Sequence, residues 1–160
     1  MQAHLRELLS AYRGEIAGEA FFLGLAQAAD DPGQAAKWRV LAQLEHEVAA
    51  RIRPELELRG IPLPSAEADQ LQGLESVDEY ARLGWRGSLA RLAPELLPYV
   101  RRFESAESIM PADLQALAQF VTAHERALVE FAQRELDHGG DRSLDAVHRL
   151  LASTPERARK

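Results

Sequence analysis

The chain has 160 residues, 46% of them hydrophobic and 28% charged, which fits a single globular domain with a core large enough to fold without disulfides. It contains no cysteine, so disulfides and thiolate metal sites are excluded. Nineteen basic residues against 25 acidic ones give a formal net charge of −6, and nucleic-acid binding is disfavoured because no basic face is available to neutralise phosphates.

Glycine, proline and helix-capping residues divide the first part of the chain into two long helices. We predict the first over about residues 2–29 and the second over about residues 33–59. Between them, Asp31 can cap the second helix, Pro32 suits its first turn, and Gln34 can complete a capping box.

The connection that follows, residues 60–76, contains a glycine and two prolines near its start, which end the second helix. Fully extended, it could span ~50 Å at ~3.3 Å per residue, enough to cross the whole molecule. A third helix is predicted over about residues 77–104, with a capping box that starts at Ser76. Pro94 and Pro98 should kink or split this helix.

A fourth helix is predicted over about residues 111–138, and a short fifth is expected from its cap at Ser143 to Leu151. Short connections make the first two and the last two long helices antiparallel pairs. The sequence therefore predicts an all-α fold, in which residues 1–152 form one four-helix bundle in up-down-down-up order with a short C-terminal helix, before a charged tail over residues 153–160. An up-down-up-down order with a slack central loop is the alternative.

Four polar side chains fall on the apolar faces of these helices. Glu15 and Glu19 continue the apolar stripe of the first helix, one turn apart. Glu45 lies on the stripe of the second helix, and His124 lies in the middle of the stripe of the fourth. All four are near the mid-length of their helices, so a bundle brings them to one level. A buried carboxylate is costly unless it is paired, hydrogen-bonded or bound to a metal, which makes this level a candidate site.

Three stretches carry a resemblance to a known family: residues 12–22 (YRGEIAGEAFF), 37–47 (KWRVLAQLEHE) and 123–128 (AHERAL). They are similar to helices of the ferritin-like superfamily, and the chain resembles its short bacterial members rather than the iron-storage proteins. The resemblance covers most of residues 5–138 at the level of helix pattern. It implies a ferritin-like four-helix bundle with a metal centre between the helices.

Metal-binding members of that family carry a glutamate on each of two helices and a Glu-x-x-His motif on each of the other two. Here Gln43 stands where the acid before His46 should be, and Val121 stands where the acid before His124 should be. Neither motif is complete, which disfavours a di-iron centre with bridging carboxylates. The resemblance and the shared level instead imply one divalent ion, iron, manganese or zinc. Its expected ligands are Glu15, Glu19, Glu45 and His124.

A second class of function stays open. The inward acids could form a metal-free Glu–His network that fixes helix register, in a bundle that serves as a structural, partner-binding or oligomerising module. Homodimerisation would then use an exposed apolar patch on the third helix. The candidates for this patch are Leu89, Leu92, Leu96 and Leu97.

We also expect a cytoplasmic protein with neither a nucleic-acid nor a membrane partner. No stretch approaches the ~18 consecutive apolar residues that cross a bilayer. Residues 1–7 lack the pattern of a signal peptide.

Overall fold

The computed structural model describes residues 1–137 and 139–153, and within these ranges 83% of the chain is helical and no strand is formed. The prediction of an all-α protein is therefore confirmed. The helices are α1 (Ala3–Ala28), α2 (Pro32–Leu58), α3 (Ala66–Leu74), α4 (Val77–Arg82), α5 (Gly84–Glu107), the 3₁₀ turn η1 (Ala112–Leu114), α6 (Gln115–Asp137) and α7 (Asp145–Ala152).

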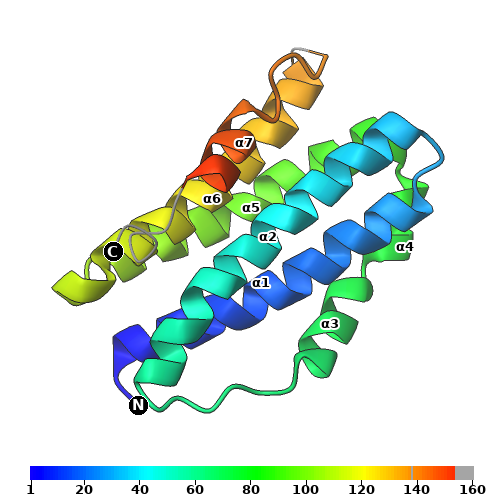
Figure 1. Ribbon diagram of the computed structural model, residues 1–160. Coiled ribbons are helices and arrows are strands. Elements are labelled where there is room, and N and C mark those ends of the chain that lie inside the picture. Colours follow the sequence, from blue (N-terminus) through cyan, green and yellow to red (C-terminus); the bar gives the residue numbers. More distant parts are fainter. Residues whose placement is uncertain (138, 154–160) are drawn as a thin grey trace.

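Four long helices form two antiparallel pairs, α1 with α2 and α5 with α6 (Figure 1). Figure 1 also shows that α2 and α5 run in the same direction, because the chain returns through α3 and α4 before α5 begins. Helix α6 contacts α2 and joins the two pairs, and α7 folds back over α6 and α2. Helix α3 packs on α1.

The start of α2 forms as its sequence predicts. The side chain of Asp31 accepts a hydrogen bond from the backbone N–H of Gln34 at 2.8 Å, and Pro32 occupies the first turn, where its missing N–H leaves no bond unmade. Helix α2 ends at Leu58, and Gly60 adopts a φ of +69°, which is typical of a residue that follows a helix.

The connection over residues 60–76 is not an extended strand of chain, because it contains the helix α3. Ser65 caps this helix by accepting from the N–H of Glu67. A Cβ added to Gly73 would lie 2.0 Å from the carbonyl oxygen of Ala17, so glycine is what allows α3 to approach the backbone of α1 so closely. The two buried residues of α3 are Asp69 and Gly73. Because neither of these is a large apolar residue, α3 has no apolar stripe from which a helix could be predicted.

The predicted third helix is split, but at a glycine and not at its prolines. It breaks between α4 and α5, where Gly84 adopts a φ of +73°. Pro94 and Pro98 both lie inside α5, on its exposed side, where water can bond the carbonyl groups that they leave free. Ser76 precedes α4 but makes no side-chain capping bond, so the predicted capping box is not formed.

The C-terminal part differs from its prediction in details of the caps. The fourth helix begins with the 3₁₀ turn η1 and continues as α6 to Asp137, and its predicted last residue, 138, lies outside the described residues. Helix α7 begins at Asp145 after Leu144, while Ser143 is buried and does not cap it. Of the predicted charged tail, residues 154–160 also lie outside the described residues.

The leucines predicted to form an exposed patch on the third helix are mostly in the core. Leu89, Leu92 and Leu96 are 0%, 4% and 8% exposed, and Leu97 alone of the four reaches solvent. These leucines recur at three- and four-residue spacing because that face of α5 turns towards the interior. The apolar patch proposed there for homodimerisation does not exist.

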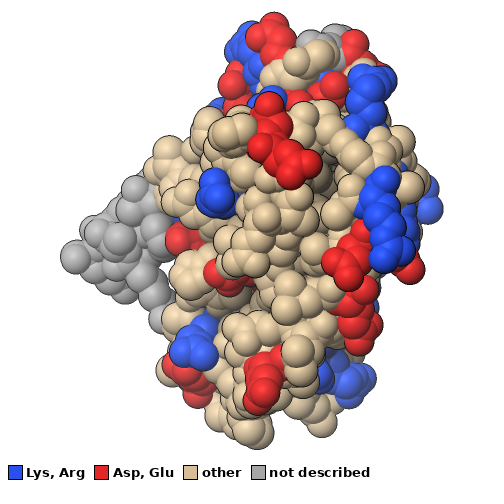
Figure 2. Space-filling model, turned by 90° about the vertical axis from the view of Figure 1, so that its right-hand side faces the viewer, with Lys and Arg blue, Asp and Glu red and all other residues tan. Residues whose placement is uncertain are grey.

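Charged side chains are mixed over the surface. On the described part of the face in Figure 2, basic and acidic groups are interspersed and separated by uncharged surface. None of the described helices combines the length and the apolar content that a membrane crossing requires.

Candidate metal site

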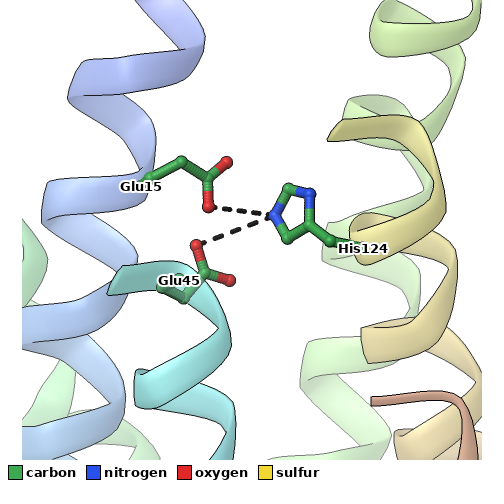
Figure 3. Close-up of side chains that lie close together, drawn as sticks. All are labelled: Glu15, Glu45 and His124. Carbon is green, nitrogen blue, oxygen red and sulfur yellow. Dashed lines mark ion pairs between the residues drawn. The ribbon is translucent and has the colours of Figure 1, made fainter. Parts of the chain in front are cut away.

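Three helices bring two carboxylates and one imidazole together in the interior. Glu15 comes from α1, Glu45 from α2 and His124 from α6, and both carboxylates point at the same ring nitrogen (Figure 3). One potential ligand atom from each residue lies within 4.8 Å of the other two. Their exposed fractions are only 2%, 4% and 0%, so water does not solvate these charges freely.

These side chains are buried because they occupy positions of the apolar stripes. Glu45 lies one turn after Leu41, and His124 lies one turn before Leu128, and both leucines are fully buried. Because the helices pack along these stripes, the polar groups have to enter the interior with their neighbours. The mid-level clustering that the sequence predicts for Glu15, Glu45 and His124 is observed.

The orientation of His124 decides what its second nitrogen can do. Nδ1 donates a hydrogen bond to the carbonyl oxygen of Val121, since a carbonyl can only accept. In the neutral imidazole, Nε2 then carries a free lone pair. Nε2 lies 2.9 Å from Oε2 of Glu15 and 3.8 Å from Oε2 of Glu45. Metal-binding histidines are commonly held in this way by a second hydrogen bond on the far nitrogen.

Two atoms of the cluster are left without hydrogen bonds. Nε2 of His124 and Oε2 of Glu15 are completely buried, and neither has a hydrogen-bond partner among the described residues. Their 2.9 Å separation is an ion-pair distance, but the angles are not those of a hydrogen bond. Buried polar groups are rarely left unpaired. Two lone pairs that face a common point fit a bound cation.

A further carboxylate, Glu125, lies beside the cluster although it is not among the metal ligands expected from the sequence. It is 5% exposed, and its Oε2 lies 3.3 Å from Nε2 of His124. Its position next to His124 on α6 was the available signal. The group whose ligand atoms lie close together is Glu15, Glu45 and His124, and Glu125 is a third carboxylate beside the same nitrogen of His124.

The structure places Glu19 away from this cluster. Glu19 is paired with His46, with Nδ1 of the histidine 3.2 Å from Oε1, and the two side chains are 31% and 68% exposed. Gln43, in the incomplete Glu-x-x-His motif of α2, is exposed as well. Gln43 and His46, the residues of α2 that correspond to the family motif, thus face outward. Among the buried residues of α2, Glu45 is the polar one.

Helix α5 contributes no side chain to the cluster within the described residues. Its one mid-helix acid, Glu95, accepts a hydrogen bond from the hydroxyl of Tyr80 and pairs with Arg91 at 3.0 Å. Within the described residues, α5 therefore has no acid placed to bridge a second metal ion at this site.

Gly18 makes space for one of the carboxylates. A Cβ at this position of α1 would lie 2.8 Å from Oε2 and 3.0 Å from Cδ of Glu45. Alanine would be the more favourable residue in the middle of a helix. Glycine instead allows the Glu45 carboxylate to lie directly against the α1 backbone.

Burial and the charge of neighbouring carboxylates favour the protonated forms of Glu45 and Glu125. Burial raises the pKa of Glu45 well above its usual value, and the nearby Glu15 carboxylate raises it further. Burial alone would lower the pKa of His124, but the attraction of Glu15 and Glu45 outweighs it and holds that pKa well above the usual range. Burial raises the pKa of Glu125 to about 8. Near neutral pH the cluster therefore holds protons unless another cation replaces them.

The three carboxylates are reachable from outside. Glu15, Glu45 and Glu125 line a cleft of about 740 Å³ whose other walls come mainly from α1, α3 and α5, whereas His124 lies behind them. An ion held by this set would thus have its protein ligands on one side and the cleft on the other.

Comparison with known protein families, curated proteins and solved structures finds no match to this chain. What the site does is therefore inferred from its own chemistry. Mixed carboxylate and imidazole donors suit iron, manganese and zinc, and with cysteine absent no thiolate ligand is available.

Proposed function

We propose that the protein is a ferritin-like four-helix bundle that binds one divalent metal ion, iron, manganese or zinc, between its helices. The ligands would be Glu15, Glu45 and His124, with Glu125 as a further carboxylate. The observation that carries the proposal is a pair of buried atoms without a hydrogen-bond partner, Nε2 of His124 and Oε2 of Glu15, which lie 2.9 Å apart beside a second carboxylate.

One ion is proposed because the donors come from three helices and none comes from α5. Di-metal carboxylate centres in helical bundles draw a ligand from each of four helices and use two Glu-x-x-His motifs. Here a backbone carbonyl, that of Val121, accepts the hydrogen bond from Nδ1–H of His124, at the position where the motif would have its acid. A metal bound here would act as a Lewis acid towards a molecule in the cleft.

The alternative is a metal-free polar network, and the 2.9 Å approach of Nε2 to Glu15 favours it. With its raised pKa, His124 can be protonated and form a buried ion pair with Glu15. The two states then differ in whether a proton or a metal ion occupies the space between the two side chains. Metal binding would accordingly release protons.

Metal uptake by matched histidine variants separates the two proposals. Protein stripped with a chelator is dialysed against Fe²⁺, Mn²⁺ or Zn²⁺ and analysed for bound metal. We expect about one ion per chain for at least one of these metals, and a loss of at least tenfold in affinity in His124→Ala. The control is His46→Ala, which removes the exposed histidine beside Glu19 and should bind as the parent does.

Failure of the parent chain to take up any of the three metals would leave the metal-free network as the function of the cluster. Equal uptake by the parent and by His124→Ala would place the metal elsewhere and would also contradict the proposal.

A further inference from the structure

The cleft beside the proposed metal site is large enough for an organic molecule. Its volume of about 740 Å³ lies within the range of about 300–1,000 Å³ that is usual for small-molecule sites. It is bounded chiefly by α1, α3 and α5, and it ends at Glu15, Glu45 and Glu125. A site for a metal ion alone would need only a small part of this space.

The walls of the cleft are mainly apolar. Helices α1 and α5 face each other across it with aliphatic and aromatic side chains. The principal ones are Leu9, Phe21, Phe22, Leu92, Leu96 and Phe103. Such walls with a few polar groups at one end are typical of sites for small organic ligands.

Small residues of α1 leave this space open. Gly14, Ala17 and Gly18 all line the cleft, although glycine is unfavourable inside a helix. A Cβ added to Gly14 would meet no atom within 4 Å, so close packing does not require a glycine there. The residue is instead found where a larger side chain would project into the cleft.

The charged groups at the cleft give no complement to a charged ligand. At its inner end, the carboxylate of Glu15, whose Oε2 has no hydrogen-bond partner, and the other two acids would repel an anion. Three arginines line the cleft. Arg13 is held by Asp69 at 3.1 Å, Arg102 is held by Glu7 at 3.0 Å, and Arg6 donates a hydrogen bond to the carbonyl oxygen of Met1. Two of these acids already face the imidazole of His124, whose Nε2 lies 2.9 Å from Glu15 and 3.3 Å from Glu125, so they are not free partners for a cationic ligand.

We propose that the cleft binds a small, uncharged and largely apolar organic molecule, whose inner end lies against Glu15, Glu45 and Glu125. Binding of this molecule requires the apolar walls and the space beside Gly14. Its contact with a metal ion rests on the proposed function, whereas its binding to the metal-free chain does not.

Three probes with the same ring system test the proposal: methyl 2-naphthoate, which is uncharged, the 2-naphthoate anion and the 2-naphthylmethylammonium cation. Their affinities for the metal-free, full-length chain are measured by fluorescence titration at neutral pH. We expect the ester to bind at least tenfold more tightly than either charged probe. Tighter or equal binding of the anion would mean that the arginines govern the site, and the same result for the cation would implicate the acids; either result overturns the proposal.

The cleft is located with a pair of leucine variants on α1. Gly14→Leu fills the space while improving the helix, and we expect it to weaken ester binding at least tenfold. Gln27→Leu adds the same side chain to an exposed position of α1 that does not line the cleft, and should leave binding unchanged. Leu96→Trp, which narrows the cleft from α5, should repeat the loss. Undiminished binding to folded Gly14→Leu would contradict the proposal.

Cobalt(II) tests the contact with the metal separately. If Co²⁺ binds at the cluster, saturating ester should change its visible absorption spectrum, because the ester reaches the open side of the ion. An unchanged spectrum with both bound would show that the ligand does not reach the cluster, against the proposal. Failure of Co²⁺ to bind would count against the metal site, while the ester titrations would still decide whether the cleft binds an organic molecule.

Discussion

His124 has its two ring nitrogens in different environments, and this difference determines its role. Nδ1 is fixed by the Val121 carbonyl, while Nε2 faces Glu15 and Glu45 in the interior. Replacing one member of such a buried group strands its partners, which typically costs ~3–5 kcal/mol, whereas replacing the whole group with apolar residues is often neutral or stabilising.

His124→Leu should therefore destabilise the metal-free chain by ~3 kcal/mol or more, because Glu15 and Glu45 lose their cationic partner. The triple variant Glu15→Leu, Glu45→Leu, His124→Leu should recover most of that loss. Urea unfolding of the parent and both variants, with chelator present, gives the three free energies of unfolding. A triple variant much less stable than His124→Leu would show that the three positions are required for folding, and that result would remove the argument that they are kept for a ligand.

The raised pKa values predict that the metal-free chain loses stability as the pH rises. Glu125 has a pKa of about 8 in the folded chain against 4.5 ordinarily, and the pKa values of Glu45 and His124 are raised too. The folded state therefore holds more protons than the unfolded chain between about pH 5 and 8. For each such extra proton, the free energy of unfolding falls by about 1.4 kcal/mol per unit rise in pH.

The free energy of unfolding, measured in urea at pH 5.5 and 7.5 with chelator, should accordingly be lower at the higher pH. A metal ion that binds the cluster should reduce this difference, because it replaces the protons. Stability that is constant or rises over this interval without metal would mean that the acids are not protonated in the folded chain.

At the residue scale, three of the four groups at the site could be predicted from the sequence. Glu19 is wrongly included because only a small rotation about the helix axis separates it from Glu15. Glu15 and Glu19 differ by about 40° around the helix axis, since a residue turns about 100°. A stripe that is more than about 100° wide includes both. Only the packing of α1 on α2 shows that Glu15 turns inward and that Glu19 meets His46 at the surface. Glu125 flanks the apolar stripe of α6 at about 100° from His124 around the helix axis, so the stripe does not show whether it turns inward.

Helix α1 offers a comparison between two of its own glycines. Gly14 and Gly18 lie one turn apart, but a Cβ at Gly14 meets nothing within 4 Å while one at Gly18 comes within 2.8 Å of Oε2 of Glu45. That oxygen is at the end of a flexible side chain and can be displaced.

Gly18→Ala should therefore keep the fold but weaken metal binding at least tenfold, because Glu45 is pushed from its position. Gly14→Ala should stabilise the helix by up to ~1 kcal/mol and leave metal binding unchanged. Thermal unfolding and metal titration of the two variants provide the measurements. Equal metal affinity in both variants would show that Glu45 does not need this position to bind.

At the element scale, helices with strong stripes and ordinary caps could be predicted, as the start of α2 at Asp31 shows. Helix α3 could not, because it buries Asp69 and Gly73, and its stability comes from contact with α1 and the Arg13–Asp69 pair. The break before α5 at Gly84 was assigned to prolines instead, since the sequence does not show which residues of a helix face water. The first of these errors concerns a contact between distant parts of the chain, and the second concerns the exposure of Pro94 and Pro98.

At the scale of the whole molecule, the cluster lies where the two antiparallel pairs meet. Glu15 and Glu45 belong to the α1–α2 pair, and His124 belongs to α6 of the other pair (Figure 3). Glu125 also belongs to α6. The same junction is packed by aromatic rings, with Trp38 of α2 centred 6.1 Å from Phe131 of α6. A metal ion at the cluster would therefore be bound by both pairs at once. Because it would bind only when the pairs are packed together, it would stabilise the folded state.

The central claim is that one divalent ion binds between Glu15, Glu45 and His124. Anomalous diffraction, recorded at the absorption edge of zinc or manganese from crystals grown with that metal, tests it most directly. We predict a single strong peak per chain, within bonding distance of Nε2 of His124 and of a carboxylate oxygen of both Glu15 and Glu45. Two adjacent peaks, a peak beside Glu19 and His46 instead, or no peak at the cluster in metal-saturated crystals would contradict this claim.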